Sequence, residues 1–233
     1  SGLAYDSANS RLFVGEDANA VVKIWNVATG SVSNGMPASF ILGTTTFGAG
    51  CFPAVSSSTL CNISGLAYDA NNHLYLVDHN GSRVMIWSVA TGTVTNGMPA
   101  TNLLGKLDGD TPNYTIAGYN NTPNNIGFNV SGPTLLDTVN HRFFAGDVSN
   151  ARILVWTLNS SNNFTSYGAN YVLGEPNFST RAGGRTSSTI NSIDDLAYDY
   201  ANNRLFVSDS SNKRVLIYNL ASGITTGMPA SNV

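Results

Sequence analysis

Four acidic residues stand at the same place in four copies of a repeated sequence and are the first candidates for a functional site. A ring of carboxylates can bind calcium or another divalent ion. Each acid directly follows a predicted strand, however, where its carboxylate can accept backbone N–H groups of the turn and reach an arginine five residues later. We therefore predict that both positions are structural. The acids are Glu16, Asp78, Asp147 and Asp209, and the arginines are Arg83, Arg152 and Arg214, with Val21 in the first copy.

A second acidic position follows the preceding predicted strand. Asp at the end of a strand commonly caps the next turn, so we predict turn formers at Asp6, Asp69, Asp137 and Asp199. Outside the repeat, Asp108 and Asp110 flank a glycine in the longest connection between copies. They could supply oxygen ligands to Ca²⁺, but the rest of a spaced ligand set is missing. A plain turn without a cofactor is the expectation, and a Ca²⁺ site is the alternative.

One aromatic position also recurs in all four copies, at Trp25, Trp87, Trp156 and Tyr218. An exposed row of aromatic rings could stack on sugar rings. Repetition at a fixed strand position is more typical of packing between neighbouring repeats, which is our prediction.

The histidines and the known catalytic motifs give no sign of a catalytic site in the sequence. His73, His79 and His141 have neither metal-ligand spacing nor a partner arrangement for a nucleophile. No GxSxG, HExxH or phosphate-binding loop is present. The sequence therefore predicts a protein that is not an enzyme.

Cys51 and Cys61 are the two cysteines, and both fall in one connection between repeats. Such a pair predicts a local disulfide that closes the loop, worth about 2–3 kcal/mol on the loop-entropy model. The alternative is two unrelated thiols. A disulfide indicates an oxidising compartment, so we expect the protein outside the cell, on its surface or in the periplasm.

The elements that must position these residues come from the internal repeat. The block SGLAYD at 1–6 returns at 64–69, as SGPTLLD at 131–137 and as DDLAYD at 194–199, and each is followed by a block similar to RLFVGEDANAVVKIW. Each copy predicts four short antiparallel strands. Tandem four-stranded units that cannot bury both faces alone predict an all-β fold, a β-propeller. The expected blades of this single domain are 2–43, 65–105, 132–174 and 195–233, with long connections at 44–63, 106–130 and 175–193.

The pattern (L/F)(F/Y)xxDxxNxRVxxW resembles the NHL-repeat family of propellers, and the xxMPASxxLG block is similar to a bacterial extracellular variety with long repeats. The resemblance implies a binding scaffold. Family members commonly close with six blades, so the four copies here suggest a closed four-bladed ring, part of a larger ring, or a missing edge that a partner completes. Some related propellers, similar to gluconolactonase or to amidating lyases, are metal enzymes. Their ligands break the repeat symmetry, whereas the polar turn residues here mostly obey it.

The composition narrows the classes of protein further. Charged residues make up 11% of the 233 residues, against roughly 25% in an average soluble domain. Two Glu and three Lys are too few to cover exposed helix faces, which excludes a mainly helical protein. The net charge of -3 argues against nucleic acid as a partner. No apolar run approaches the ~18 residues of a membrane span.

Together these observations predict a non-catalytic extracellular β-propeller that is a binding scaffold or a surface structural protein. Its protein or glycan ligand would bind the connections between blades, especially 44–63 and 106–130. The low charge, the near-identical repeats and the incomplete last blade support an alternative, a self-assembling fibre or filament subunit joined through propeller edges. A second alternative is a metal-dependent lactonase-like or lyase-like enzyme with a site in the central channel.

Overall fold

A computed structural model describes residues 2–43, 55–108, 111–116, 124, 127 and 132–233. The fold is all-β, as predicted: every sheet is antiparallel, and the described residues contain no α-helix. The chain divides into two compact units, Ser1–Gly118 and Tyr119–Val233. Each unit holds two successive copies of the repeat.

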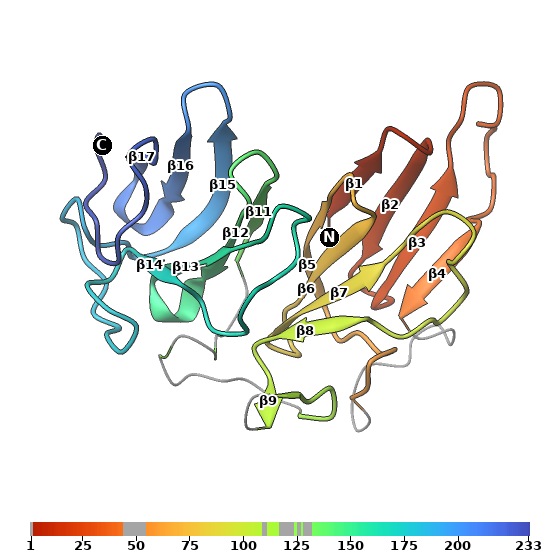
Figure 1. The fold of residues 1–233 in the computed structure, drawn as a ribbon, viewed down its shortest axis with the longest axis horizontal. Helices are drawn as coiled ribbons and strands as arrows, with labels where there is room; N and C mark the ends of the chain where they lie inside the picture. The colour runs from red at the N-terminus through yellow and green to blue at the C-terminus, as the bar shows by residue number, and fades with distance from the viewer. Residues whose placement is uncertain (1, 44–54, 109–110, 117–123, 125–126, 128–131) are drawn as a thin grey trace. The chain divides into compact units, whose positions relative to one another are not determined.

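The first unit contains two four-stranded sheets in which consecutive strands pair as neighbours (Figure 1). Its first sheet is β1 (Leu3–Asp6), β2 (Arg11–Glu16), β3 (Val21–Asn26) and β4 (Phe40–Gly43). Its second sheet is β5 (Ile63–Tyr68), β6 (His73–Asp78), β7 (Arg83–Ser88) and β8 (Asn102–Leu104), followed by a small hairpin of β9 (Leu107–Asp108) and β10 (Thr111–Pro112).

The second unit repeats this arrangement with one difference in its last sheet. The third sheet is β11 (Thr134–Asp137), β12 (Arg142–Asp147), β13 (Arg152–Thr157) and β14 (Tyr171–Leu173), and the fourth is β15 (Ile193–Asp199), β16 (Arg204–Asp209) and β17 (Arg214–Asn219). Short 3-10 turns, η1 (Val148–Asn150) and η2 (Ser210–Asn212), follow β12 and β16. The predicted fourth strand of the last sheet is reduced to one bridge, Ile217 to Asn232.

Alternating side chains give every sheet two apolar faces. The face that carries Trp25, Trp87, Trp156 or Tyr218 is called here the Trp face. The face that carries the aromatic residue of the second strand, Phe13, Tyr75, Phe144 or Phe206, is called the Phe face. Because strand neighbours are in register, as in Leu12 to Trp25 and Leu74 to Trp87, each face collects residues from adjacent strands.

Within each unit the Trp face of the later sheet packs on the Phe face of the earlier one. In the first unit Leu74, Met85 and Trp87 pack with Phe13 and Ile24, and all five are buried. In Figure 1 the β5–β8 sheet accordingly lies against the β1–β4 sheet. In the second unit the equivalent contact joins Leu205, Leu216 and Tyr218 to Phe144 and Val155. One sheet-on-sheet contact is therefore built twice.

A glycine allows the first strands of neighbouring sheets to come close. A Cβ at Gly2 would lie 2.9 Å from the backbone nitrogen of Leu66, closer than real side chains approach. The sequence SGLAYD at the start of the repeat thus has a packing reason for its glycine.

Candidate functional site

The three predicted Asp–Arg pairs are formed, and all lie at the ends of the second and third strands of their sheets. The Arg Nε lies 2.8 Å from the Asp Oδ2 in Asp78–Arg83, 2.9 Å in Asp147–Arg152 and 2.8 Å in Asp209–Arg214. The five-residue spacing follows from strand pairing, because the last residue of the second strand faces the first residue of the third. These pairs are called here the anchor pairs.

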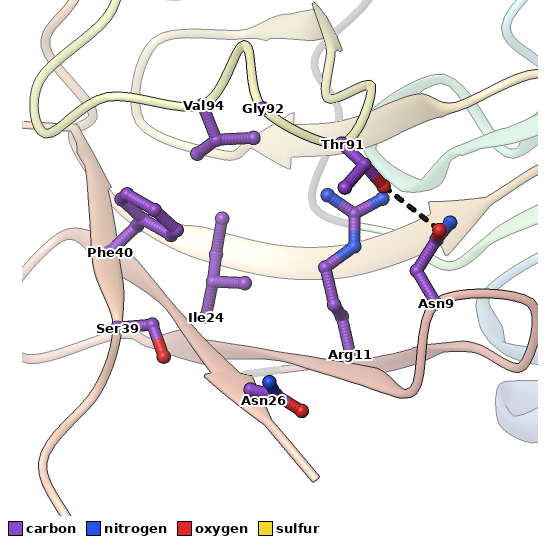
Figure 2. A pocket seen from close by; sticks show the side chains of 9 residues that line it. All are labelled: Asn9, Arg11, Ile24, Asn26, Ser39, Phe40, Thr91, Gly92 and Val94. Atoms are coloured by element: carbon purple, nitrogen blue, oxygen red, sulfur yellow. Dashed lines mark hydrogen bonds between the residues drawn. The ribbon is translucent and has the colours of Figure 1, made fainter. Parts of the chain in front are cut away.

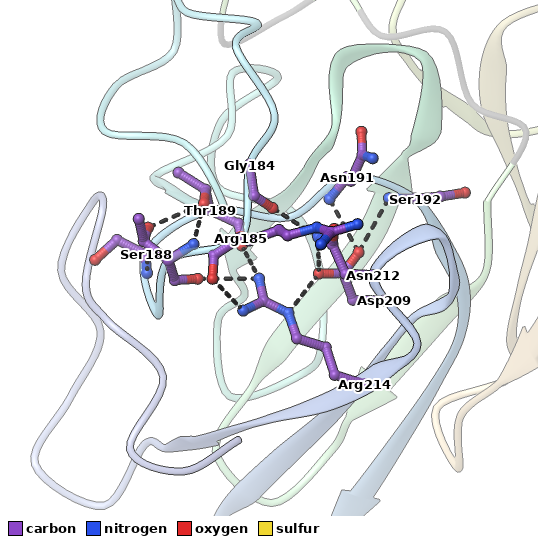
Figure 3. Close-up of polar contacts among 10 residues, drawn as sticks. Gly184, Arg185, Ser188, Thr189, Asn191, Ser192, Asp209, Asn212 and Arg214 are labelled. Carbon is purple, nitrogen blue, oxygen red and sulfur yellow. Dashed lines mark hydrogen bonds and ion pairs between the residues drawn. The ribbon is translucent and has the colours of Figure 1, made fainter.

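The other N–H groups of each anchor arginine donate to carbonyl groups of the connections between sheets. Arg83 donates to Thr59 O at 2.7 Å, Tyr114 O at 3.1 Å and Ser56 O at 3.3 Å. Arg214 makes the same kind of contact with the carbonyls of residues 185, 186 and 189, at 2.7–3.0 Å (Figure 3). The guanidinium therefore fastens the connection to the sheet end and is not displayed to a ligand.

The anchor aspartates correct one detail of the prediction. The sequence predicts that they accept N–H groups of the turn that follows them. Instead Asp78 Oδ1 accepts the amides of Cys61 and Asn62 at 2.9 and 3.1 Å. Asp209 Oδ1 likewise accepts the amides of residues 191 and 192, at 3.0 and 3.2 Å. The donors belong to the connection before the sheet, because the following turn presents the Asn212 side chain, which donates to Asp209 Oδ2 at 2.8 Å.

These hydrogen bonds set the protonation of the buried carboxylate in the last sheet. Burial by itself would raise the pKa of Asp209, but donors from Asn212, the Asn191 amide and Arg214 outweigh it. The pKa therefore lies below its ordinary value, and the anchor is ionised at neutral pH.

The first copy has a different pair at the anchor position. Val21 replaces the arginine, and Glu16 pairs with Lys23 at 2.5 Å and accepts Asn19 Nδ2 at 2.9 Å. These two donors hold the pKa of Glu16 below its ordinary value. Glu16 and Lys23 are both partly exposed, so this pair is the least enclosed of the four.

The second acidic position forms the predicted turns. Asp6 Oδ1 accepts the amides of Ala8 and Asn9 at 3.1 and 3.0 Å, and Asp6 Oδ2 pairs with Arg11 at 2.6 Å. Burial would raise the pKa of Asp6, but hydrogen bonds from Asn9 and Arg11 outweigh it and lower the pKa. The equivalent acids Asp69, Asp137 and Asp199 also accept amides of their own turns.

The repeated aromatic position is buried in three of the four copies. Trp87, Trp156 and Tyr218 have no exposed surface, so their rings are not open to a sugar, whereas Trp25 is partly exposed. The Nε1 of Trp25, Trp87 and Trp156 donates to a carbonyl eleven residues later, at 3.1–3.2 Å. In the first two copies the acceptor is the methionine of the GMPA segment, so the tryptophan fixes the link between the third and fourth strands.

A pocket of about 220 Å³ lies between the first two sheets. Figure 2 shows its apolar side, where Phe40, Ile24 and Val94 come together. Its polar lining is Asn9, Arg11, Asn26, Ser39 and Thr91.

The pocket offers polar groups without an unbalanced charge. Arg11 is its one charged lining residue, and that guanidinium pairs with Asp6 and donates to Val89 O at 2.6 Å. Thr91 Oγ1 donates to Asn9 Oδ1 at 2.8 Å across the pocket. The arrangement suits a small neutral ligand with an apolar face. The sequence alone does not reveal this pocket, because its residues come from two repeats that meet only after folding.

Where the structure describes them, the remaining candidates lie apart from one another in a turn, a small hairpin or a pair with one neighbour. Asp108 is the last residue of β9, while Asp110 lies outside the described residues. In the described part of the chain no group of three or more His, Cys, Asp or Glu could hold a metal. His73 Nδ1 lies 2.9 Å from Asp69 and His141 Nδ1 lies 2.7 Å from Asn162.

The disulfide stays a prediction. Cys51 lies outside the described residues, so the disulfide with Cys61 is not tested. The backbone at Cys61 is held by the Asp78 carboxylate, which accepts the Cys61 amide at 2.9 Å.

Comparison with protein-family models and with curated proteins gave no match. Across the described residues, no helix has the length and apolar character needed to cross a membrane. The observed class is an all-β protein of tandem antiparallel sheets, three with four strands and the last with three, in which Asp–Arg pairs of the last three sheets hold the connections.

Proposed function

We propose that this chain is a non-catalytic, extracellular β-propeller that serves as a binding scaffold and takes a neutral glycan unit in the pocket between its first two sheets. The repeated face-to-face contact of successive sheets supports the propeller. The neutral pocket beside a fixed framework supports the binding role, and it is the observation that carries the proposal.

The pocket argues for a sugar ring on grounds of size and chemistry. Its volume of about 220 Å³ is smaller than the ~300–1,000 Å³ typical of sites for drug-sized ligands, so it admits one ring or one side chain. Phe40, 37% exposed, presents an aromatic surface on which the apolar face of a sugar can lie. Asn26 and Ser39 stand beside it as hydrogen-bonding groups, and the balanced charge of Arg11 gives no reason to prefer an anion.

The anchor pairs support a scaffold more than a catalyst. The surroundings of a catalytic acid or base usually hold its pKa near the pH at which the enzyme works. The pKa of Asp209 is instead lowered by its hydrogen-bond donors, and the anchor arginines donate to carbonyl groups of the connections. Their contribution is to hold the connections in place, which is what a recognition surface on loops requires.

Saturation-transfer difference NMR with N-acetylglucosamine, galactose, mannose and fucose tests the proposal. At least one sugar is expected to receive saturation from the protein, and Phe40→Ala should abolish the transfer. Val32→Ala is the matched control, because Val32 is an exposed residue of the same unit that does not line the pocket. Absence of transfer from all four sugars, or transfer that survives Phe40→Ala, would contradict the proposed site.

The extracellular location rests on the predicted Cys51–Cys61 disulfide and on the low charge. The direct check is thiol labelling of the protein purified from its natural source and then denatured without a reducing agent. We expect no labelled cysteine before reduction and two afterwards. Labelling of both cysteines without reduction would remove this support.

A further inference from the structure

Each of the two compact units has one apolar sheet face with large exposed side chains, on the first sheet along the chain and on the last. The Trp face of the first sheet exposes 67% of Leu3 and 54% of Tyr5. The Phe face of the fourth sheet exposes 49% of Val215, with Phe206 partly buried beside it. That second face is hollowed, in a pocket lined by Phe206, Val215 and Ala197 among others.

These two faces are the two halves of the contact that the chain already makes twice. The second-sheet equivalents of Leu3 and Tyr5 are Leu66 and Tyr68, and both pack into the core against the first sheet. The equivalents of Val215 are Val22 and Ile153, and those of Phe206 are Phe13 and Phe144, all four fully buried. The residue types at the open positions therefore match those of a buried interface.

We propose that the Trp face of the first sheet binds the Phe face of the fourth sheet of a second copy of this chain, so that copies associate head to tail. This goes beyond the ligand-binding role and involves different residues. A second copy is the occupant that supplies both complementary halves, and a contact between two different patches is heterologous, so it leads to rings or filaments. It also differs from pairing of strand edges, because Ser231 and Asn232 already hydrogen-bond Ile217 at the edge of β17.

The charged pair on the Trp face of the first sheet is compatible with burial. Lys23 lies where Met85 and Leu216 stand in the buried contacts, but it is paired with Glu16 at 2.5 Å. Burying this pair leaves no isolated charge, which would be the costly case.

One residue limits how closely the second copy can approach. Asp195 occupies the place of Gly2, the glycine that permits the close contact with Leu66. Asp195 is exposed, and its Oδ1 accepts the amide of Leu196 at 2.8 Å. The contact between copies is therefore centred on β16 and β17, and Asp195 weakens the association.

Light scattering and sedimentation of the purified chain over a range of concentrations test the proposal. The wild-type mass should rise above that of a monomer with concentration. Leu3→Lys and Val215→Lys should each be monomeric, and an equimolar mixture of the two should form a dimer, because each variant keeps the half that the other lacks. Val139→Lys is the control, at a turn residue that is 66% exposed and belongs to neither face. Asp195→Gly should lower the dissociation constant of the contact between copies by about tenfold, equivalent to ~1.4 kcal/mol.

Several results would overturn the inference. One is a strict monomer at every concentration; another is association that survives both lysine variants. A mixture of the two variants that stays monomeric would show that these are not the two partner faces. A monomer that both lysine variants destabilise, while Val139→Lys does not, would show that the faces meet within one chain. Circular dichroism of each variant confirms that it is folded.

Discussion

Replacing Arg152 with methionine removes the guanidinium of one anchor pair and leaves an unbranched apolar side chain that is shorter than arginine. Arg152 has no exposed surface, and its Nε lies 2.9 Å from Asp147. Its other nitrogens donate to Phe178 O at 2.5 Å, Asn124 O at 2.9 Å and Gly127 O at 3.2 Å. The variant therefore leaves a buried carboxylate without its cation and three carbonyls without this donor.

The expected cost follows from the burial of the pair. Removing one partner of a buried ion pair costs about 3–5 kcal/mol, because the other charge stays buried. A domain is stable by about 5–15 kcal/mol, so this loss is large. Arg204→Met is the matched control in the same unit, since Arg204 and Asp199 also pair, at 2.7 Å, but their side chains are 42% and 23% exposed. Exposed pairs contribute about 0–1 kcal/mol, so the control should change little.

Amide hydrogen exchange followed by peptide mass spectrometry measures both variants. In Arg152→Met, peptides that cover β12, β13 and residues 175–185 should exchange faster than in the wild type, by an amount that corresponds to ~3 kcal/mol or more. In Arg204→Met the same peptides should be nearly unchanged. Equal effects of the two variants, or a loss below about 1 kcal/mol in Arg152→Met, would refute the anchor role.

Three further predictions concern single residues of the framework. Asp209→Asn should destabilise the protein at pH 7, and in urea melts the difference from wild type should shrink as the pH falls below 3.8, because the lowered pKa of Asp209 gives stability that is lost on protonation; a difference that does not shrink at all as the pH falls contradicts this. Trp87→Phe should cost ~1 kcal/mol or more by thermal unfolding, since it removes the hydrogen bond to Met98 O, and an unchanged melting temperature speaks against that link. Gly174→Ala should lower the melting temperature, because Gly174 has φ +86° and an added Cβ would lie 2.5 Å from Ile190; an alanine variant as stable as wild type would exclude the strain.

The sheets and the anchor pairs were predictable because both depend on residues close in sequence. Strands alternate in hydrophobicity, and a five-residue spacing across a tight turn places Asp78 opposite Arg83 whatever the rest of the chain does. The same local logic identified the turn-forming aspartates at the ends of the first strands.

The contacts made across repeats were not predictable in the same way. The carbonyls that Arg83 binds and the amides that Asp78 accepts come from segments 16–31 residues away, whose paths depend on tertiary packing. The pocket combines Phe40 with Thr91, which belong to different sheets. The packing role of Gly2 depends on how one sheet lies against the next. The effect of Asp195 at the same place in the last copy depends on that packing too.

Chemical-shift mapping on ¹⁵N-labelled protein tests the binding role most directly. With a sugar that shows saturation transfer, the amides of Asn26, Ser39, Thr91 and Gly92 are expected to shift together and to saturate with one dissociation constant. Shifts confined to residues far from this pocket, or no shifts at millimolar sugar, would contradict the account of a neutral glycan site held between the first two sheets.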